Sequence, residues 1–339
     1  MRRSLIYGLL LAACLLGTAA AQQRASEELY WPKPPGTPRI QFLYAFSGKQ
    51  DLGIEKSFWR KLADVVFGEE KDINNIIRPQ GVTVDAEGRV YVTDIGAKGV
   101  HVFDFEEKEY KLITGSDDTR LVSPVGVAVS PAGSLYVSDS ELGAILVFNR
   151  HGDYEFSISG ELKRPTGLWL SSGFLYVVDT GANMVVVFDL DGHEKFRFGR
   201  RGVENGEFNF PVYVCAGVVP KTEALDKLYL VDAMNFRLQI LQPDGKFLSK
   251  FGKLGDGIGD FARPKGVALD SQGHIYVADA LYDVIQVFDQ NGQILLAFGG
   301  TGTGFGSFYL PAGIAIDAKD RIYVVDSGNR RVQVFQFLQ

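Results

Sequence analysis

The 339-residue chain has little cysteine, little histidine and no excess of positive charge. Its two cysteines cannot make a disulfide framework. The 35 Lys and Arg residues are outnumbered by 41 Asp and Glu, and the net charge of −6 disfavours nonspecific binding to nucleic acid and polybasic attachment to lipid. After the first residues no apolar run reaches the ~20 residues that span a membrane, so we expect no transmembrane helix in the mature chain.

Residues 1–21 follow the pattern of a secretory signal peptide. Arg2 and Arg3 precede an apolar stretch from Leu5 to Leu16, and the alanines at 19–21 supply the small side chains that a signal peptidase requires. We therefore expect an exported, periplasmic protein. A second interpretation stays open because residues 11–14 resemble a bacterial lipobox, and cleavage there would leave the chain anchored to lipid through Cys14.

Residues 22–39 are polar and then rich in proline, with four prolines between positions 32 and 38. Such a composition stiffens the chain in an extended form. We interpret the segment as a linker between the processing site and the folded domain. A proline-rich docking motif is the alternative.

One β-rich phrase recurs six times along the rest of the chain. The copies begin at prolines 79, 124, 165, 211, 264 and 311. Each copy continues with a second run that ends in aspartate, then with a third and a fourth run, separated by Asp-Gly, Asn-Gly and similar turns. Four short runs per copy predict four antiparallel strands, and a sheet with two apolar faces requires a neighbour on each side. The sequence therefore predicts an all-β, six-bladed β-propeller.

The sequence also predicts how the ring closes. The last copy stops after its third run, at residues 332–335, and lacks a fourth. The missing run has a match at residues 40–47 near the N-terminus. We expect this segment to be the outer strand of the last blade, so that the propeller domain extends over residues 40–339.

Two stretches resemble the NHL-repeat family of six-bladed propellers. One is Tyr323–Phe335, and the other is the glycine-rich linker 299–311, which recurs at 252–264 and 199–211. The resemblance covers residues 78–339 together with the closing strand, and the exported signal suggests a bacterial member. It implies the propeller fold, but NHL propellers include enzymes, RNA-binding modules and protein-binding modules, so the function has to come from the site.

One insertion interrupts the repeats at about residues 50–74. Its apolar residues Ile54, Phe58, Leu62 and Val65 follow helical spacing, which predicts a short helix. The helix either covers an apolar patch or serves as a lid or docking element. Phe58 and Trp59 would be its contact residues in the second case.

The propeller topology assigns each loop to one of two faces. The loops that enter the inner strands and the turns between second and third strands share one face, which we call the top face. Two interpretations stay open for the arginines that precede three of the prolines: ion pairs with carboxylates at the blade ends, or a cationic rim for an anionic ligand. The candidate binding residues near the mouth of the central channel are Arg78, Gln80, Arg164, Thr166, Arg263 and Lys265.

An aspartate ends the second run of every copy. A carboxylate at this turn can accept hydrogen bonds from the N–H groups of the turn itself. Because one ligand site would not need six equivalents, we predict a structural role and no metal for Asp94, Asp139, Asp179, Asp232, Asp279 and Asp326.

The sequence does not place the residue types that could bind a catalytic metal around one point. A zinc site requires three protein ligands around one point, but His101 is expected in a third strand and His151, His193 and His274 in turns away from the channel. We therefore favour a non-enzymatic, monomeric binding scaffold without a cofactor, whose partner is an unidentified envelope protein or a small ligand. The alternative is a metal-dependent lyase or lactonase that acts at the channel mouth.

Overall fold

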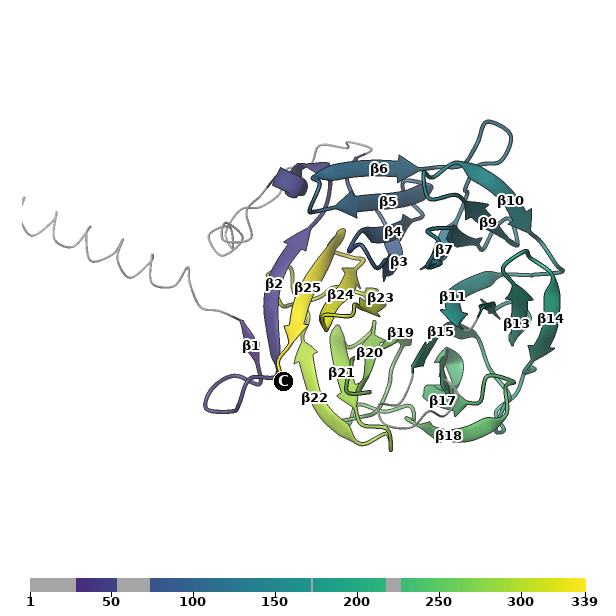
Figure 1. The fold of residues 1–339 in the computed structure, drawn as a ribbon. Helices are drawn as coiled ribbons and strands as arrows, with labels where there is room; N and C mark the ends of the chain where they lie inside the picture. Colours follow the sequence, from purple (N-terminus) through teal and green to yellow (C-terminus); the bar gives the residue numbers. More distant parts are fainter. Residues whose placement is uncertain (1–28, 54–73, 172, 218–226) are drawn as a thin grey trace, which may run out of the picture.

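The computed structural model describes residues 29–53, 74–171, 173–217 and 227–339, and these form a closed ring of six blades (Figure 1). Each blade is an antiparallel sheet whose first strand lies at the axis of the ring and whose fourth lies at the rim. The six first strands contact one another in succession around the axis, with the sixth against the first. The predicted six-bladed propeller is confirmed.

The strands are named by their position in the blade. The inner strands are β3 (Pro79–Val84), β7 (Pro124–Val129), β11 (Pro165–Ser171), β15 (Pro211–Gly217), β19 (Pro264–Leu269) and β23 (Pro311–Ile316). The second strands are β4 (Val90–Asp94), β8 (Leu135–Asp139), β12 (Phe174–Asp179), β16 (Lys227–Asp232), β20 (Ile275–Asp279) and β24 (Arg321–Asp326). The third strands are β5 (Gly99–Asp104), β9 (Ala144–Phe148), β13 (Met184–Asp189), β17 (Arg237–Leu241), β21 (Val284–Phe288) and β25 (Arg331–Phe337). The outer strands are β6 (Glu109–Ile113), β10 (Tyr154–Ile158), β14 (Glu194–Phe198), β18 (Phe247–Phe251), β22 (Ile294–Gly299) and β2 (Ile40–Phe46).

Burial follows the position of a strand in its blade. Second strands such as β8 and β20 are buried at every residue, since they lie inside the sheet and carry apolar side chains on both faces. Outer strands such as β10 alternate between partly buried and exposed residues. The apolar core is therefore divided into six clusters, one between each pair of neighbouring blades.

The N-terminal strand closes the ring as predicted. Strand β2 pairs with β25 from Ile40 opposite Phe337 to Phe46 opposite Val332. The ring of Phe46 lies edge-on against that of Phe103 in the first blade, with 4.8 Å between ring centroids. The two ends of the chain are thus joined in one sheet, and that sheet packs on the first blade.

The linker before β2 contributes more than a spacer. Its residues Tyr30–Trp31 form a two-residue strand, β1, that pairs with β2 and gives the last blade a fifth strand (Figure 1). The Trp31 ring lies 5.8 Å from the ring centroids of both Phe298 and Phe335. Because a two-residue strand has no periodicity, the sequence offered no signal for it.

Only the start of the predicted insertion is described. Residues Lys49–Gly53 form a 3-10 helix, η1, and a second such helix, η3, spans Ala233–Asn235 in the fourth blade. The rest of the predicted helix, with Phe58 and Trp59, lies outside the described residues, as do the predicted signal peptide at 1–21 and Cys14. Within the described residues, no helix has the length and apolar character needed to span a membrane.

Candidate functional site

The six repeated aspartates are fully buried at the top end of the second strands. In the first blade, Asp94 accepts hydrogen bonds from the N–H groups of Gly96 and Ala97 in its own turn, as the sequence suggested, and also from Ile77 and Arg78 in the loop that enters the inner strand. Asp139, Asp179 and Asp279 likewise accept two hydrogen bonds from the loop that enters their inner strand, whereas Asp232 and Asp326 accept one each. Each carboxylate therefore holds two top-face loops together.

In the fourth and sixth blades the same carboxylate also holds an arginine. Asp326 accepts a hydrogen bond from Nε of Arg331 at 2.7 Å and another from Nε2 of Gln333 at 3.0 Å. Asp232 is bonded in the same way by Arg237 and Gln239. These side chains all lie within the blade, so they form a structural network.

His101 belongs to an equivalent network in the first blade. It stands in β5 at the register position that Gln333 has in β25. Its ring is fully buried, with Nδ1 2.8 Å from the Tyr110 hydroxyl and Nε2 3.3 Å from Asp94. Burial favours a raised pKa for Asp94, but the hydrogen bonds from His101 and the backbone outweigh it and lower that pKa. His101 is therefore part of the blade and does not face the axis.

The three arginines before the inner-strand prolines do not form the ion pairs that were one of the two interpretations. Their backbone N–H groups bond to Asp94, Asp179 and Asp279, while the side chains of Arg78, Arg164 and Arg263 are exposed. In the described part of the chain, no carboxylate oxygen lies within 4.0 Å of these three guanidinium groups. The blade-end carboxylates are already bonded to the backbone, so these three cations are exposed on the top face without an ion-pair partner among the described residues.

The second residue of each inner strand forms what we call the axial ring: Gln80, Val125, Thr166, Val212, Lys265 and Ala312. Thr166 is buried, and its hydroxyl donates to the Val212 carbonyl of the next blade at 3.0 Å. The Gln80 amide donates to its neighbour Pro79. The predicted binding residues thus lie in three pairs, Arg78/Gln80 in the first blade, Arg164/Thr166 in the third and Arg263/Lys265 in the fifth, and both members are cationic in the fifth alone.

The top face also carries an apolar set that the sequence analysis missed. Of the thirteen large hydrophobic side chains exposed in the described residues, the ten in top-face loops and turns are named here the apolar rim: Ile77, Leu142, Val203, Phe210, Met234, Leu254, Ile258, Leu281, Tyr309 and Leu310. The other three, Phe196, Leu248 and Leu295, lie on outer strands. The sequence signal was present, since Met234 and Leu281 occupy turn positions where polar residues are usual.

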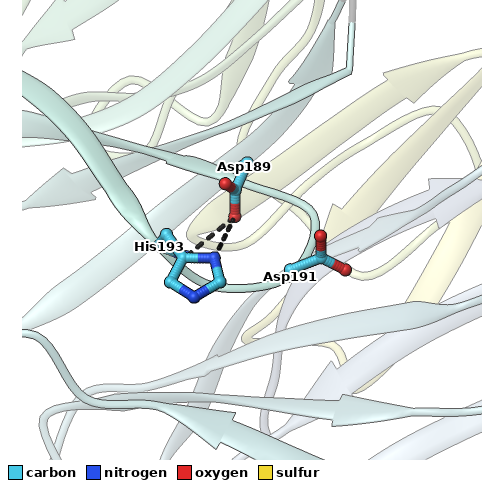
Figure 2. A group of neighbouring side chains, drawn as sticks. All are labelled: Asp189, Asp191 and His193. Carbon is cyan, nitrogen blue, oxygen red and sulfur yellow. Dashed lines mark hydrogen bonds and ion pairs between the residues drawn. The ribbon is translucent and has the colours of Figure 1, made fainter.

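The remaining histidines lie at the opposite end of the blades. His151 and His193 are in turns between third and fourth strands, and His274 directly precedes β20. His193 makes the one cluster of potential metal ligands among the described residues, with Asp189 and Asp191 of the same turn (Figure 2). Asp189 accepts a hydrogen bond from the His193 N–H at 2.8 Å, so the turn itself accounts for the cluster.

The Asp270–His274 pair predicts a pH-dependent contribution to stability. The hydrogen bond from His274 Nδ1 to Asp270 Oδ2, 2.8 Å long, raises the histidine pKa above its ordinary value of 6.5. The stabilisation is complete below the unfolded pKa and is lost as pH rises through the higher folded pKa. We expect H274Q to lower the free energy of unfolding by about 1 kcal/mol at pH 5.5 and by less at pH 8.5.

Urea titrations at the two pH values measure this difference. H151Q is the control, because it replaces a histidine in an exposed turn and should show no such pH dependence. An equal loss for H274Q at both pH values would show that the charged form of His274 has no special role.

The ring of six four-stranded blades defines the class: the chain is a six-bladed β-propeller. It carries NHL repeats, since residues 261–283 and 308–335 match the NHL repeat model. Among curated proteins it is 34% identical over 80 residues to RING finger protein nhl-1 of Caenorhabditis elegans and 28% identical over 123 residues to Protein brain tumor of Drosophila melanogaster. These matches cover 23% and 36% of this chain but only 7% and 11% of the relatives, so the similarity is confined to about a tenth of their length.

Solved structures agree on the fold. A streptogramin B lyase has a TM-score of 0.58 at 13% identity, over 77% of this chain and 93% of that one. A virginiamycin B lyase from Staphylococcus aureus has a TM-score of 0.57 at 13% identity, over 78% and 97%. Hydrazine synthase of Kuenenia stuttgartiensis has a TM-score of 0.54 at 12% identity, over 80% and 98%. At such identities the likeness shows the architecture alone.

Proposed function

We propose that this protein is an exported, non-enzymatic binding scaffold of the cell envelope that holds a protein partner on its top face. The observation that carries the proposal is the apolar rim. Of the thirteen large apolar side chains exposed in the described residues, ten lie on this one face, and an apolar face of this kind favours binding to a protein. The residues of the apolar rim lie in loops and turns. This placement fits a scaffold in which the buried carboxylates hold the loops in position and the loops bind the partner.

The charges of the top face complement this picture. The side chains of Arg78, Arg164 and Arg263 are exposed, and none has an ion-pair partner within the part of the chain that the structure describes. The chain as a whole has a net charge of −6, so the charge of these three side chains is opposite to the net charge of the protein. A partner with apolar residues and carboxylates would fit both features, and complementary charge would also favour its approach.

Matched leucines provide the test. Leu281 on the rim is 61% exposed and Leu295 on outer strand β22 is 52% exposed, so the two differ mainly in their face. A photo-crosslinking amino acid at position 281, in cells that produce the protein, is expected to give a discrete covalent adduct, identified by mass spectrometry. The same group at position 295 should give none. Equal labelling at both positions, or no adduct from position 281, would contradict the proposal.

The pair L254S/L281S should then reduce, at least tenfold, the adduct formed from a crosslinker at Met234. The control L248S/L295S removes two exposed leucines from outer strands and should leave that adduct unchanged. Both doubles should melt close to the wild type, because all four side chains are already exposed.

The alternative of a metal-dependent lyase or lactonase rests on fold likeness. No described group of His, Cys, Asp and Glu side chains gathers at the top face, and the one described cluster, at Asp189, lies at the other end of the blades. We therefore favour binding over catalysis. Zinc retained at one equivalent through dialysis would reverse that preference.

A further inference from the structure

The six inner strands contain a single charged side chain, that of Lys265. All other residues of these strands are neutral, and most are apolar. The neighbours of Lys265 in the axial ring are Val212 of the fourth blade and Ala312 of the sixth, since β19 contacts β15 and β23. The Lys265 ammonium is therefore the only charged group of the axial ring, at the top end of the inner strands.

Lys265 is partly buried. Its ammonium group makes no hydrogen bond or ion pair with any part of the chain that the structure describes. The carboxylate at the top end of the second strand of its blade, Asp279, is bonded to the N–H groups of Ala262, Arg263 and Leu281. The charge that acts on Lys265 is that of Arg263, which has the same sign. Burial lowers the lysine pKa, and Arg263 lowers it further.

Removing an ammonium group partly from water costs free energy, because its surroundings do not replace the lost hydration when no counter-ion is present. In a purely structural position a neutral residue would serve better, as Val125, Val212 and Ala312 do in other blades. A bound anion would remove the cost, because it supplies the missing opposite charge and accepts the hydrogen bonds of the ammonium. The apolar members of the axial ring would contact the uncharged part of the same ligand.

We propose that Lys265, with Arg263 beside it, forms a binding site for an organic carboxylate at the top end of the propeller axis. The charged end of the ligand meets the two cations, and its apolar body lies along the neutral inner strands. The carboxylate belongs to a free small molecule or to the C-terminus of a polypeptide. This site contains no residue of the apolar rim, and only Arg263 is common to the two proposals, so tests on Lys265 decide it independently of partner docking.

The first test measures binding by calorimetry with octanoate and with the peptide acetyl-Ala-Ala-Leu-Val in its free-acid form. We expect at least one of the two to bind the full chain, and K265Q to weaken that binding at least tenfold. The control K246Q removes an exposed lysine from a turn at the opposite end of the blades and should have no effect. Octanoate binding alone indicates a small-molecule ligand, and peptide binding that is lost on amidation indicates a polypeptide terminus.

Two further probes make the proposal falsifiable. Octanol in place of octanoate should bind at least tenfold more weakly, and inorganic phosphate should not compete with octanoate. If octanol binds equally, if phosphate competes as well as octanoate, or if neither carboxylate binds, the site is not an organic-carboxylate site. The same conclusion follows if K265Q binds like the wild type.

A structural readout excludes simple misfolding. K265Q is expected to melt no lower than the wild type, because it removes an uncompensated charge. With lysines labelled by 13C reductive methylation, the Lys265 resonance, identified by its absence in K265Q, should titrate at a lower pH than the exposed lysines. Octanoate should shift its midpoint upward, since an anion favours the charged form; an unchanged midpoint would contradict the proposal.

Discussion

A chain that begins at Lys49, and so lacks strands β1 and β2, is expected not to fold cooperatively. Strand β2 buries Ile40, Tyr44, Ala45 and Phe46 against the last and first blades. Each large apolar side chain contributes about 1.5–3 kcal/mol when fully buried. Losing them together removes a large part of the about 5–15 kcal/mol that stabilises an ordinary domain. Circular dichroism should then show a broad, low-amplitude melt.

A chain that begins at Arg39 provides the comparison. It keeps β2 but loses Trp31 and its contacts with Phe298 and Phe335. We expect it to fold cooperatively with a loss of about 2 kcal/mol. A chain that begins at Leu29 should melt like the full chain. If the Lys49 and Leu29 chains melt at the same temperature, closure by β2 does not stabilise the ring.

The substitution D326A is expected to destabilise the protein by about 3–5 kcal/mol, because it leaves a buried arginine without its counter-ion. The side chain of Arg331 is 9% exposed and that of Asp326 is fully buried. Asp279 offers an internal control, since the position equivalent to Arg331 in that blade is Val284. D279A removes the hydrogen bonds from the N–H groups of Ala262, Arg263 and Leu281 without stranding a charge, so its loss should be smaller.

Chemical denaturation of four variants measures this difference. In D326A/R331M the stranded guanidinium is removed, and we expect it to regain part of the stability lost in D326A. D189A, in the exposed turn of the third blade, should be nearly neutral. Equal losses for D326A and D279A would mean that the loop hydrogen bonds, and not the ion pair, dominate at this position.

Residues that recur in every copy carried the fold prediction. The proline and the aspartate that recur in all six copies, Pro311 and Asp326 in the last, fix where an inner strand begins and where its partner ends, since these two residues face each other in the register. The missing fourth strand of the last copy then indicated where residues 40–47 belong. Periodic, local patterns of this kind are visible in one sequence.

Features that depend on contacts between blades were not visible. Trp31 packs against Phe298 and Phe335, which lie more than 260 positions away in the sequence. The residues next to Trp31 in the sequence give no indication of these contacts. The arginines looked suited to ion pairs until the structure showed the same carboxylates bonded to their backbone instead. The isolation of Lys265 is likewise a property of six strands together, so it appears only when they are assembled.

The closure of the ring by β2 and β25 has a consequence for the order of events in synthesis. Ile40 is among the first described residues to be made, and its partner Phe337 is among the last. Blades one to five each consist of consecutive strands and can form as the chain lengthens, whereas the last blade has to wait for the final residues. Until then Phe46 and its neighbours have no strand to pair with, so an unfinished chain exposes an apolar segment with unpaired backbone groups. A factor that shields residues 40–46 during synthesis would therefore improve the yield of folded protein.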